Sequence, residues 1–250
     1  MSSKRPPTSI LVIDIGGSKV KISVSGQQES RKCPSGPGLT PDQLVESVKQ
    51  LANGWKYEAI SIGYPGPVGD NGPRSEPGNL GHGWVGYNFA TAFERPVRIL
   101  NDAAMQALGC YEGGRMLFLG LGTGLGSALI AENVIVSLEL GELRDREGER
   151  LWRILGERGR KRFGNRVWRR AVRDAVKTLG TAFLVDDIVL GGGNAKLFRK
   201  PPPGSRLGGN RAAFRGGFRL WHIQDAQTHD GKETLPDGQS KVDDQEWRLL

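Results

Sequence analysis

SILVIDIGGSKVKISV, at residues 9–24, is the stretch that decides the fold. Two runs rich in apolar and β-branched residues, at 9–15 and 18–25, flank the pair Gly16 and Gly17, and this pattern predicts a β-hairpin with a glycine tip. Glycine leaves backbone N–H groups unobstructed by a Cβ atom, so such a tip suits the oxygens of a phosphate group. The stretch therefore predicts a phosphate-binding hairpin.

A second stretch, MLFLGLGTGLGSALI at 116–130, repeats the pattern of the first. Aligned without gaps, the two place Ile15 on Leu121, Gly16 on Gly122 and Gly17 on Thr123. Neither tip has the GxxxxGK[ST] pattern, and a strand follows the second tip, where a dinucleotide fingerprint requires a helix. Two such hairpins indicate duplicated α/β units that face each other across a cleft. Two ordinary β-turns are the alternative.

A carboxylate ends the first strand of the first hairpin. Asp14 precedes the glycine tip, and Lys19 follows it. A carboxylate repels phosphate, but it can hold a metal ion, directly or through water, and Mg²⁺ prefers such hard oxygen ligands. The ammonium group of Lys19 would offset phosphate charge. The tip therefore predicts a site for phosphate together with Mg²⁺.

The rest of the chain alternates strands and helices. Thr40 and Pro41 have the residue types of an N-cap and a first helical position, so a helix is expected to begin there. The other expected strands are 29–33, 59–64, 97–100 and 187–190, and the other expected helical segments are 84–94, 102–112, 150–184 and 210–221. The tail from 222 to 250 has few apolar residues, which predicts poor order and little effect of its removal.

The positive charge is concentrated in one segment. The chain has a net charge of +8, and the segment 144–173 alone holds twelve Arg or Lys against four Asp or Glu. Such asymmetry indicates an anionic partner or a solvated helical face. We interpret the aromatic residues of the segment as helix core, so we expect no nucleic-acid binding. These aromatic residues are Trp152, Phe163 and Trp168.

Composition excludes several classes of protein. The two cysteines, Cys33 and Cys110, form neither a disulfide framework nor a cysteine-rich zinc cluster. No apolar run is long enough to span a bilayer, and the first residues, MSSKRPPTS, contain no apolar segment of a secretory signal. We therefore expect a cytoplasmic protein without membrane association.

Several motifs in this order resemble the ROK family of sugar kinases, within the hexokinase/actin-like superfamily. They are DIGGSK at 14–19, GYPGPV at 63–68, NLGHGW at 79–84, Asn101-Asp102, GLGTGLGSAL at 120–129, ELG at 139–141 and IVLGGGN at 188–194. The short form without a cysteine cluster is most similar to the polyphosphate/ATP glucokinase branch. The resemblance implies two ribonuclease-H-like α/β domains, at 1–100 and 101–221, and a homodimer.

The resemblance also implies roles for individual residues. Asp102 matches the catalytic base that takes the proton of the sugar hydroxyl, and it is also a candidate N-cap for the helix that follows. Asn79 and Asn101 match positions that bind sugar hydroxyls, and Trp84 would support them. The phosphate loops match Gly16, Gly17, Ser18, Gly122, Thr123 and Gly124, and the stretch along the adenosine of ATP matches Gly191, Gly192, Gly193 and Asn194.

One motif departs from the family pattern. Glu139 matches the glutamate of an ExGH motif that binds hydroxyls near the anomeric carbon, but Glu142 stands where the family has histidine. Because that histidine is a zinc ligand in zinc-bearing members, we expect no zinc. The extra negative charge would favour a sugar carrying an amine, or it would accompany weakened activity.

These observations together predict a kinase that uses ATP or polyphosphate, with Mg²⁺, to phosphorylate the 6-hydroxyl of glucose or a related hexose. The basic segment, with Arg160, Lys161 and Arg162 at its centre, is the expected polyphosphate track. Two alternatives stay open at this point: a sugar-binding sensor or structural protein that has lost turnover, and an actin-like filament or chaperone ATPase.

Overall fold

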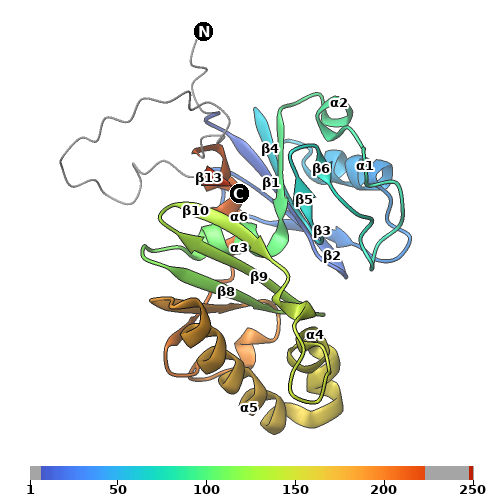
Figure 1. The fold of residues 1–250 in the computed structure, drawn as a ribbon. Helices are drawn as coiled ribbons and strands as arrows, with labels where there is room; N and C mark the ends of the chain where they lie inside the picture. The colour runs from blue at the N-terminus through green and yellow to red at the C-terminus, as the bar shows by residue number, and fades with distance from the viewer. Residues whose placement is uncertain (1–6, 223–247, 250) are drawn as a thin grey trace, which may run out of the picture. The chain divides into compact units, whose positions relative to one another are not determined.

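The computed structural model describes residues 7–222 and 248–249, and most of the predicted tail lies outside these residues. The chain forms two compact units, Met1–Gly109 with Gly209–Trp221, and Cys110–Gly208 with His222–Leu250 (Figure 1). The first unit thus includes the segment 101–109 and a segment from the C-terminal end of the described chain, beyond the boundary at residue 100 that the sequence suggested. Within the described residues, no helix is long and apolar enough to cross a membrane.

The first unit contains a five-stranded mixed sheet in the order β3-β2-β1-β4-β7. Its strands are β1 (Ile10–Ile15), β2 (Lys19–Val24), β3 (Arg31–Pro34), β4 (Ala59–Tyr64) and β7 (Val97–Asn101). β1 and β2 form the predicted hairpin, whereas β1, β4 and β7 run parallel. A two-stranded ribbon, β5 (Val68–Gly69) and β6 (Gly72–Pro73), follows β4. The parallel strands bring their carboxyl ends to one edge of the sheet.

Helices cover both faces of this sheet. On one face, α1 (Pro41–Leu51) and α2 (Phe89–Phe93) pack on a core that includes Leu11, Ile13 and Ile62. The predicted cap of α1 is confirmed, because Thr40 and Gln43 form a capping box. On the other face lie α3 (Asp102–Cys110) and α6 (Ala212–Arg219), which is followed by the 3₁₀ turn η3 (Leu220–His222). A Cβ atom on Gly217 of α6 would lie only 3.1 Å from the Cβ atom of Val12 on β1, so that position needs glycine.

The second unit contains a six-stranded sheet in the order β12-β11-β8-β9-β10-β13. Its strands are β8 (Met116–Leu121), β9 (Leu125–Ala131), β10 (Val134–Leu138), β11 (Asp187–Gly191), β12 (Ser205–Leu207) and β13 (Arg248–Leu249). Its helical segments are α4 (Leu151–Leu155), α5 (Glu157–Phe183) and the 3₁₀ turns η1 (Leu140–Glu142) and η2 (Ala195–Leu197). Buried residues of α5, among them Trp168, Val172 and Val176, join Leu117 and Leu119 of β8 in one core. Gly164, with φ 75° and ψ 162°, interrupts the helical conformation of α5.

Both units build their sheets in the same way, which confirms the duplication inferred from the two glycine-tipped hairpins. Counted along each unit, the five principal strands have the order 3-2-1-4-5, and strand 2 is antiparallel to strand 1. The sequence did not predict β10 or β12, which are the two outermost of these five strands in the second sheet. The expected helix at 84–94 was too long, because only Phe89–Phe93 is helical.

Candidate functional site

The carboxyl edge of the first sheet gathers the polar residues that the sequence singled out in this unit. One row across the sheet pairs Asp14 with Lys21 on β2 and with Gly63 on β4, and Gly63 in turn pairs with Leu100 on β7. Gly63 lies close under the start of α3, since a Cβ atom there would lie 3.6 Å from the Cα atom of Asp102 and still nearer the Met105 side chain. Asp14 and the start of α3 thus lie on the same face at the same edge.

Asp14 is a shielded carboxylate. Its side chain is 14% exposed, and its Oδ2 atom lies 3.5 Å from the Nζ atom of Lys21. Burial raises the pKa of Asp14, and the Lys21 ammonium opposes that rise. Among residues 7–222, no three His, Cys, Asp or Glu side chains form a cluster that could hold a metal ion. Asp14 therefore fits a Mg²⁺ ion that takes most of its ligands from phosphates and water, as Mg²⁺ commonly does.

The tip between β1 and β2 is fastened at its base. The N–H of Gly16 donates to the carbonyl of Lys19 at 3.0 Å, and Ser35 holds the tip from β3's side through bonds to Gly16 and Ser18. Gly17, Ser18 and Lys19 are exposed. The tip thus presents backbone and one cation to solvent, and its role as a phosphate loop stays a prediction.

Asn101, rather than Asp102, caps α3. The Oδ1 atom of Asn101 accepts hydrogen bonds from the N–H groups of Ala103 and Ala104, at 3.0 and 3.1 Å, and its Nδ2 atom donates to the carbonyl of Gly66. Its amide oxygen is therefore already used twice, which leaves one N–H for a ligand. Asp102 is half-buried and is the first residue of the helix, where the helix dipole stabilises its negative charge.

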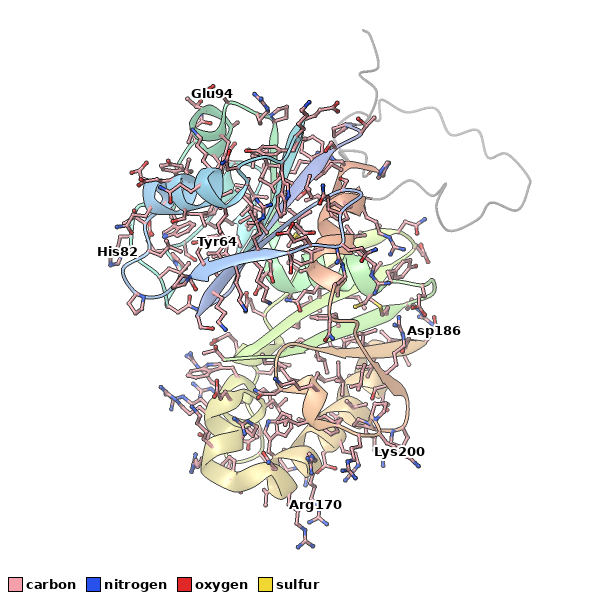
Figure 2. All side chains as sticks on the ribbon, turned by 180° about the vertical axis from the view of Figure 1, so that it is seen from behind. Tyr64, His82, Glu94, Arg170, Asp186 and Lys200 are labelled. Atoms are coloured by element: carbon pink, nitrogen blue, oxygen red, sulfur yellow. The ribbon has the colours of Figure 1, made fainter. Side chains whose placement is uncertain are left out.

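The loop that carries Asn79 lies at the carboxyl end of β4. Tyr64, the last residue of β4 and the neighbour of Asn101 in the sheet, donates its hydroxyl hydrogen bond to the carbonyl of Ser75 at 2.8 Å (Figure 2). The ring of fully buried Trp84 lies 5.7 Å from the Tyr64 ring, between centroids. Asn79 is half-buried, and its carboxamide has no hydrogen-bond partner within the described chain. It is available to a ligand, whereas most of Asn101 is not.

In the second unit, the structure brings the two predicted nucleotide segments together. The backbone N–H of Asn194 donates to the carbonyl of Leu121 at 2.9 Å, and its side chain donates to the carbonyl of Gly122 at 3.3 Å. Gly192 has φ +77°, and a Cβ atom there would lie 2.7 Å from the Leu121 carbonyl group. The N–H of Glu157, the first residue of α5, donates to the carbonyl of Gly122 at 2.9 Å. The tip at 122–124 is thus held at Gly122 by Asn194 and by the start of α5, while Thr123 stays exposed.

The departure from the family motif is compensated by a neighbouring cation. Glu142 forms an ion pair with Arg150, with 2.9 Å between Oε2 and Nη1. Glu139 precedes this turn, and burial, followed by the charge of Glu142, raises the pKa of Glu139. Arg150 was not predicted as a partner, because nothing in residue spacing reveals an ion pair across an irregular loop.

The basic segment divides into paired and unpaired cations. Arg160 and Lys161 form ion pairs with Glu157, and Arg162 pairs with Glu149. After the break at Gly164, four exposed cations lie on one face of α5 with no ion pair to any residue in the described part of the chain. We call these four the basic stripe: Arg166, Arg170, Arg173 and Lys177. Figure 2 shows Arg170 pointing away from the protein.

The predicted site residues therefore form two groups. In the first unit, the carboxyl edge of the sheet unites Asp14, the first tip, the Asn79 loop, Asn101 and Asp102. In the second unit, the tip at 122–124 contacts Asn194, and Glu139 and Glu142 belong to the turn that follows β10. The sequence missed three partners in these groups. Lys21 pairs with Asp14, Arg150 pairs with Glu142, and the Glu76 carboxylate accepts hydrogen bonds from the backbone N–H groups of Trp84 and Val85.

Comparisons with known proteins identify the fold of the chain, but not its substrate or its activity. No family model matches the sequence, and none of the curated proteins matches it. Among solved structures, the inorganic polyphosphate/ATP-glucomannokinase from Arthrobacter sp. strain KM has a TM-score of 0.70 at 21% identity, covering 87% of this chain and 98% of that chain. A ROK family glucokinase from Streptomyces griseus, in complex with glucose and AMPPNP, has a TM-score of 0.63 at 20% identity, with 86% and 98% covered.

A ROK family transcriptional regulator, a homolog of the E. coli MLC protein, also matches, with a TM-score of 0.58 at 15% identity over 85% of this chain and 77% of that chain. The chain therefore has the α/β fold of the ROK family sugar kinases, with two ribonuclease-H-like units. This fold is shared by kinases and by regulators.

Proposed function

We propose that this protein is a ROK family sugar kinase that transfers a phosphoryl group from ATP or polyphosphate to the 6-hydroxyl of glucose or a related hexose. One observation carries the proposal. The first residue of α3, Asp102, lies at the sheet edge that also holds Asp14 and the loop of Asn79. A base, a metal-binding carboxylate and a hydroxyl-binding amide at one edge are what phosphoryl transfer to a sugar requires.

The chemistry assigns one role to each group. The Asp102 carboxylate takes the proton of the 6-hydroxyl while the hydroxyl oxygen forms a bond to the terminal phosphorus, and the bond from that phosphorus to the leaving phosphate oxygen breaks. Asn101 holds the first turn of α3, and so fixes where Asp102 lies. Asp14 would hold Mg²⁺, which when bound neutralises charge on the donor phosphates.

We propose one sugar-binding residue in each unit taken by itself. In the first unit, Asn79 is the proposed hydroxyl ligand, because its carboxamide has no partner within the described residues. In the second unit, Glu139 is the proposed hydroxyl ligand, because its sequence resembles the ExGH motif. The ion pair of Glu142 with Arg150 weakens the preference that the extra carboxylate would give to an amino sugar. A neutral hexose such as glucose or mannose is therefore as suitable an acceptor as glucosamine.

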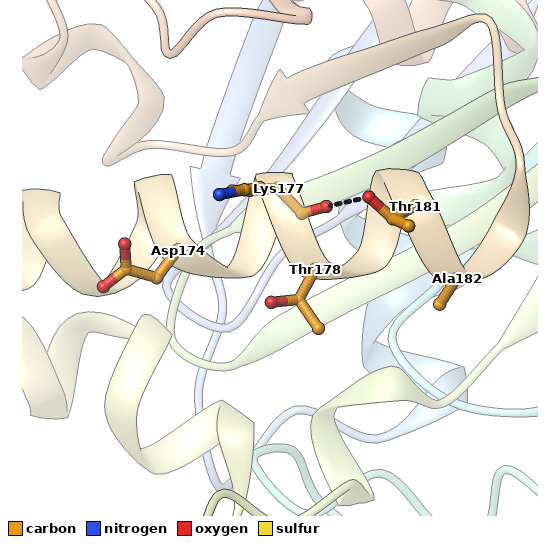
Figure 3. A pocket seen from close by; sticks show the side chains of 5 residues that line it. All are labelled: Asp174, Lys177, Thr178, Thr181 and Ala182. Atoms are coloured by element: carbon orange, nitrogen blue, oxygen red, sulfur yellow. Dashed lines mark hydrogen bonds between the residues drawn. The ribbon is translucent and has the colours of Figure 1, made fainter.

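The donor is held by backbone in the second unit. Asn194 donates one hydrogen bond to Gly122 in the tip at 122–124 and one to Leu121 just before it. This tip and the turn from Gly191 to Asn194 form the proposed ATP site. The basic stripe on α5 supports polyphosphate as a further donor, because its four cations have no acidic partner in the described chain. Figure 3 shows Lys177, the last cation of the stripe, beside Asp174, Thr178, Thr181 and Ala182 along a shallow pocket on this helix.

Because the cations at 160–162 are already ion-paired, the basic stripe is the better target for a variant that tests polyphosphate use. Alanine at Arg166, Arg170 and Arg173 should weaken polyphosphate use, steeply so at low salt, and spare ATP. The matched control is the triple at Arg160, Lys161 and Arg162, which also removes three charges, but ones already held by Glu157 and Glu149. Equal losses in the two triples would show that only net charge matters.

A coupled assay that crosses glucose, mannose and glucosamine with ATP and polyphosphate tests the proposed function. We expect hexose 6-phosphate with ATP and Mg²⁺. A protein that binds these sugars without turnover would instead be a sensor, the alternative that the shared fold of the ROK regulator supports. The homodimer and the cytoplasmic location stay predictions.

A further inference from the structure

We propose that Glu76 is a positioning residue that fixes the sugar-binding loop of Asn79, and this inference rests on the proposed sugar kinase function. The Glu76 carboxylate accepts two consecutive backbone hydrogen bonds, from the N–H of Trp84 at 3.2 Å and from the N–H of Val85 at 3.3 Å. Hydrogen bonds to an ionised acceptor are stronger than those between neutral groups. The two bonds therefore close a loop, residues 77–83, that contains Asn79.

The loop is anchored at both ends but held lightly between them. Ser75 is held by the Tyr64 hydroxyl, and the Trp84 ring packs between Tyr64 and Phe89. Between these ends, Leu80 is buried, and the N–H of Gly81 donates to the carbonyl of Leu39 at 3.0 Å. The carboxylate of Glu76 is the side chain that ties the first end of the loop directly to the second.

The position of Trp84 is not fixed by a hydrogen bond from its indole N–H group to any described residue. Its indole Nε1 atom is buried and has no hydrogen-bond partner within the part of the chain that the structure describes. Ring packing and the bond from its backbone N–H to Glu76 therefore fix its position. Because Trp84 packs on Tyr64, and Tyr64 pairs with Asn101, the Glu76 bonds keep the Asn79 loop in register with the sheet edge that carries Asp102.

Three variants test this role. Glu76→Ala removes both hydrogen bonds, and Glu76→Gln keeps one acceptor oxygen. Glu58→Ala is the matched control, because the Glu58 carboxylate also accepts a backbone hydrogen bond, from Thr8 at 2.9 Å, but at the opposite end of β4. Hydrogen exchange of the segment 77–85, measured without any sugar, should become faster in Glu76→Ala and stay unchanged in Glu58→Ala.

Kinetics then separate positioning from general stability. Glu76→Ala should raise the KM for the hexose about tenfold, with kcat and the KM for ATP nearly unchanged, and Glu76→Gln should restore part of the loss. If Glu76 acts through Asn79, adding Glu76→Ala to an Asn79→Ala variant should change the KM by less than about twofold.

The outcomes separate the inference from the proposed function. A parent protein that phosphorylates hexose, together with a Glu76→Ala variant that matches Glu58→Ala in hexose KM, would overturn the positioning role and leave the function standing. Fully additive effects of Glu76→Ala and Asn79→Ala would overturn it as well. A parent that phosphorylates no sugar would remove both, whatever hydrogen exchange shows.

Discussion

The two units share a strand order but differ in what stands on the equivalent row of their sheets. In the first unit, that row carries Lys21, Asp14 and Gly63, and in the second it carries Gly126, Gly120 and Gly191. The space beside the second row is filled by Phe118, whose ring would lie 3.3 Å from a Cβ atom on Gly120. One scaffold thus presents a carboxylate in the first unit and bare backbone in the second.

The tips of the two hairpins also differ, in their length and in how far they are bonded to neighbouring residues. Four residues separate the last paired residues, Ile15 and Val20, in the first hairpin, whereas three separate Leu121 and Leu125 in the second. The first tip is largely exposed, but the second is bonded to Asn194 and to the start of α5. The first unit therefore presents a carboxylate and an exposed tip at this edge, whereas the second presents glycine backbone and a tip that is bonded to its neighbours.

The largest expected effect on stability concerns α3 and α6, the helices that cover the face of the first sheet on which Asp14 lies. A Cβ atom on Gly216 of α6 would lie 2.8 Å from the Met105 carbonyl carbon and nearer still to its oxygen. Backbone cannot move as a side chain can, so Gly216→Ala should lower the free energy of unfolding by about 3 kcal/mol. Gly38→Ala, where a Cβ atom meets nothing within 4 Å, is the control. Chemical denaturation measures both, and equal stability would show that α3 and α6 pack less closely than described.

A second variant probes the glycine row of the other sheet. A Cβ atom on Gly191 would lie 2.6 Å from the Cε2 atom of the Phe118 ring and nearer still to its Cζ atom. Gly191→Ala should therefore destabilise the protein by about 2 kcal/mol through overpacking, and Phe118→Leu in the same chain should recover part of this. Thermal unfolding reports the change. A loss that Phe118→Leu does not relieve would mean that the ring does not fill the row.

The smallest expected effect concerns the turn after β10. Replacing Glu142 by Gln removes a negative charge near Glu139, so the pKa of Glu139 should fall toward its ordinary value. The acid limb of the pH profile for hexose binding would then move to lower pH. Glu142→His should shift relative kcat/KM among glucose, mannose and glucosamine by about tenfold or less. Unchanged pH and sugar profiles would place Glu142 outside the sugar site.

The sequence predicted the elements that have a regular residue pattern, and it missed the side-chain contacts made through irregular loops. Both hairpins, β4 and the capping box of α1 followed from apolar periodicity, glycine tips and cap residue types. The ion pair of Glu142 with Arg150 joins residues through a loop, whose path no periodicity encodes. The same is true of the two hydrogen bonds that Glu76 accepts from the backbone N–H groups of Trp84 and Val85. The cap of α3 was placed one residue late, because Asn101 and Asp102 are both good cap residues and only the geometry distinguishes them.

The central claim is that Asp102 at the edge of the first unit does the chemistry while the second unit holds the donor. The most direct measurement compares the parent with Asp102→Ala in hexose-dependent phosphoryl transfer, alongside equilibrium binding of ATP. A positioned base contributes about 10²–10⁴-fold, so turnover should fall by that factor while the Kd for ATP stays the same. Turnover within a few fold of the parent, or a matching loss of ATP binding, would contradict the account.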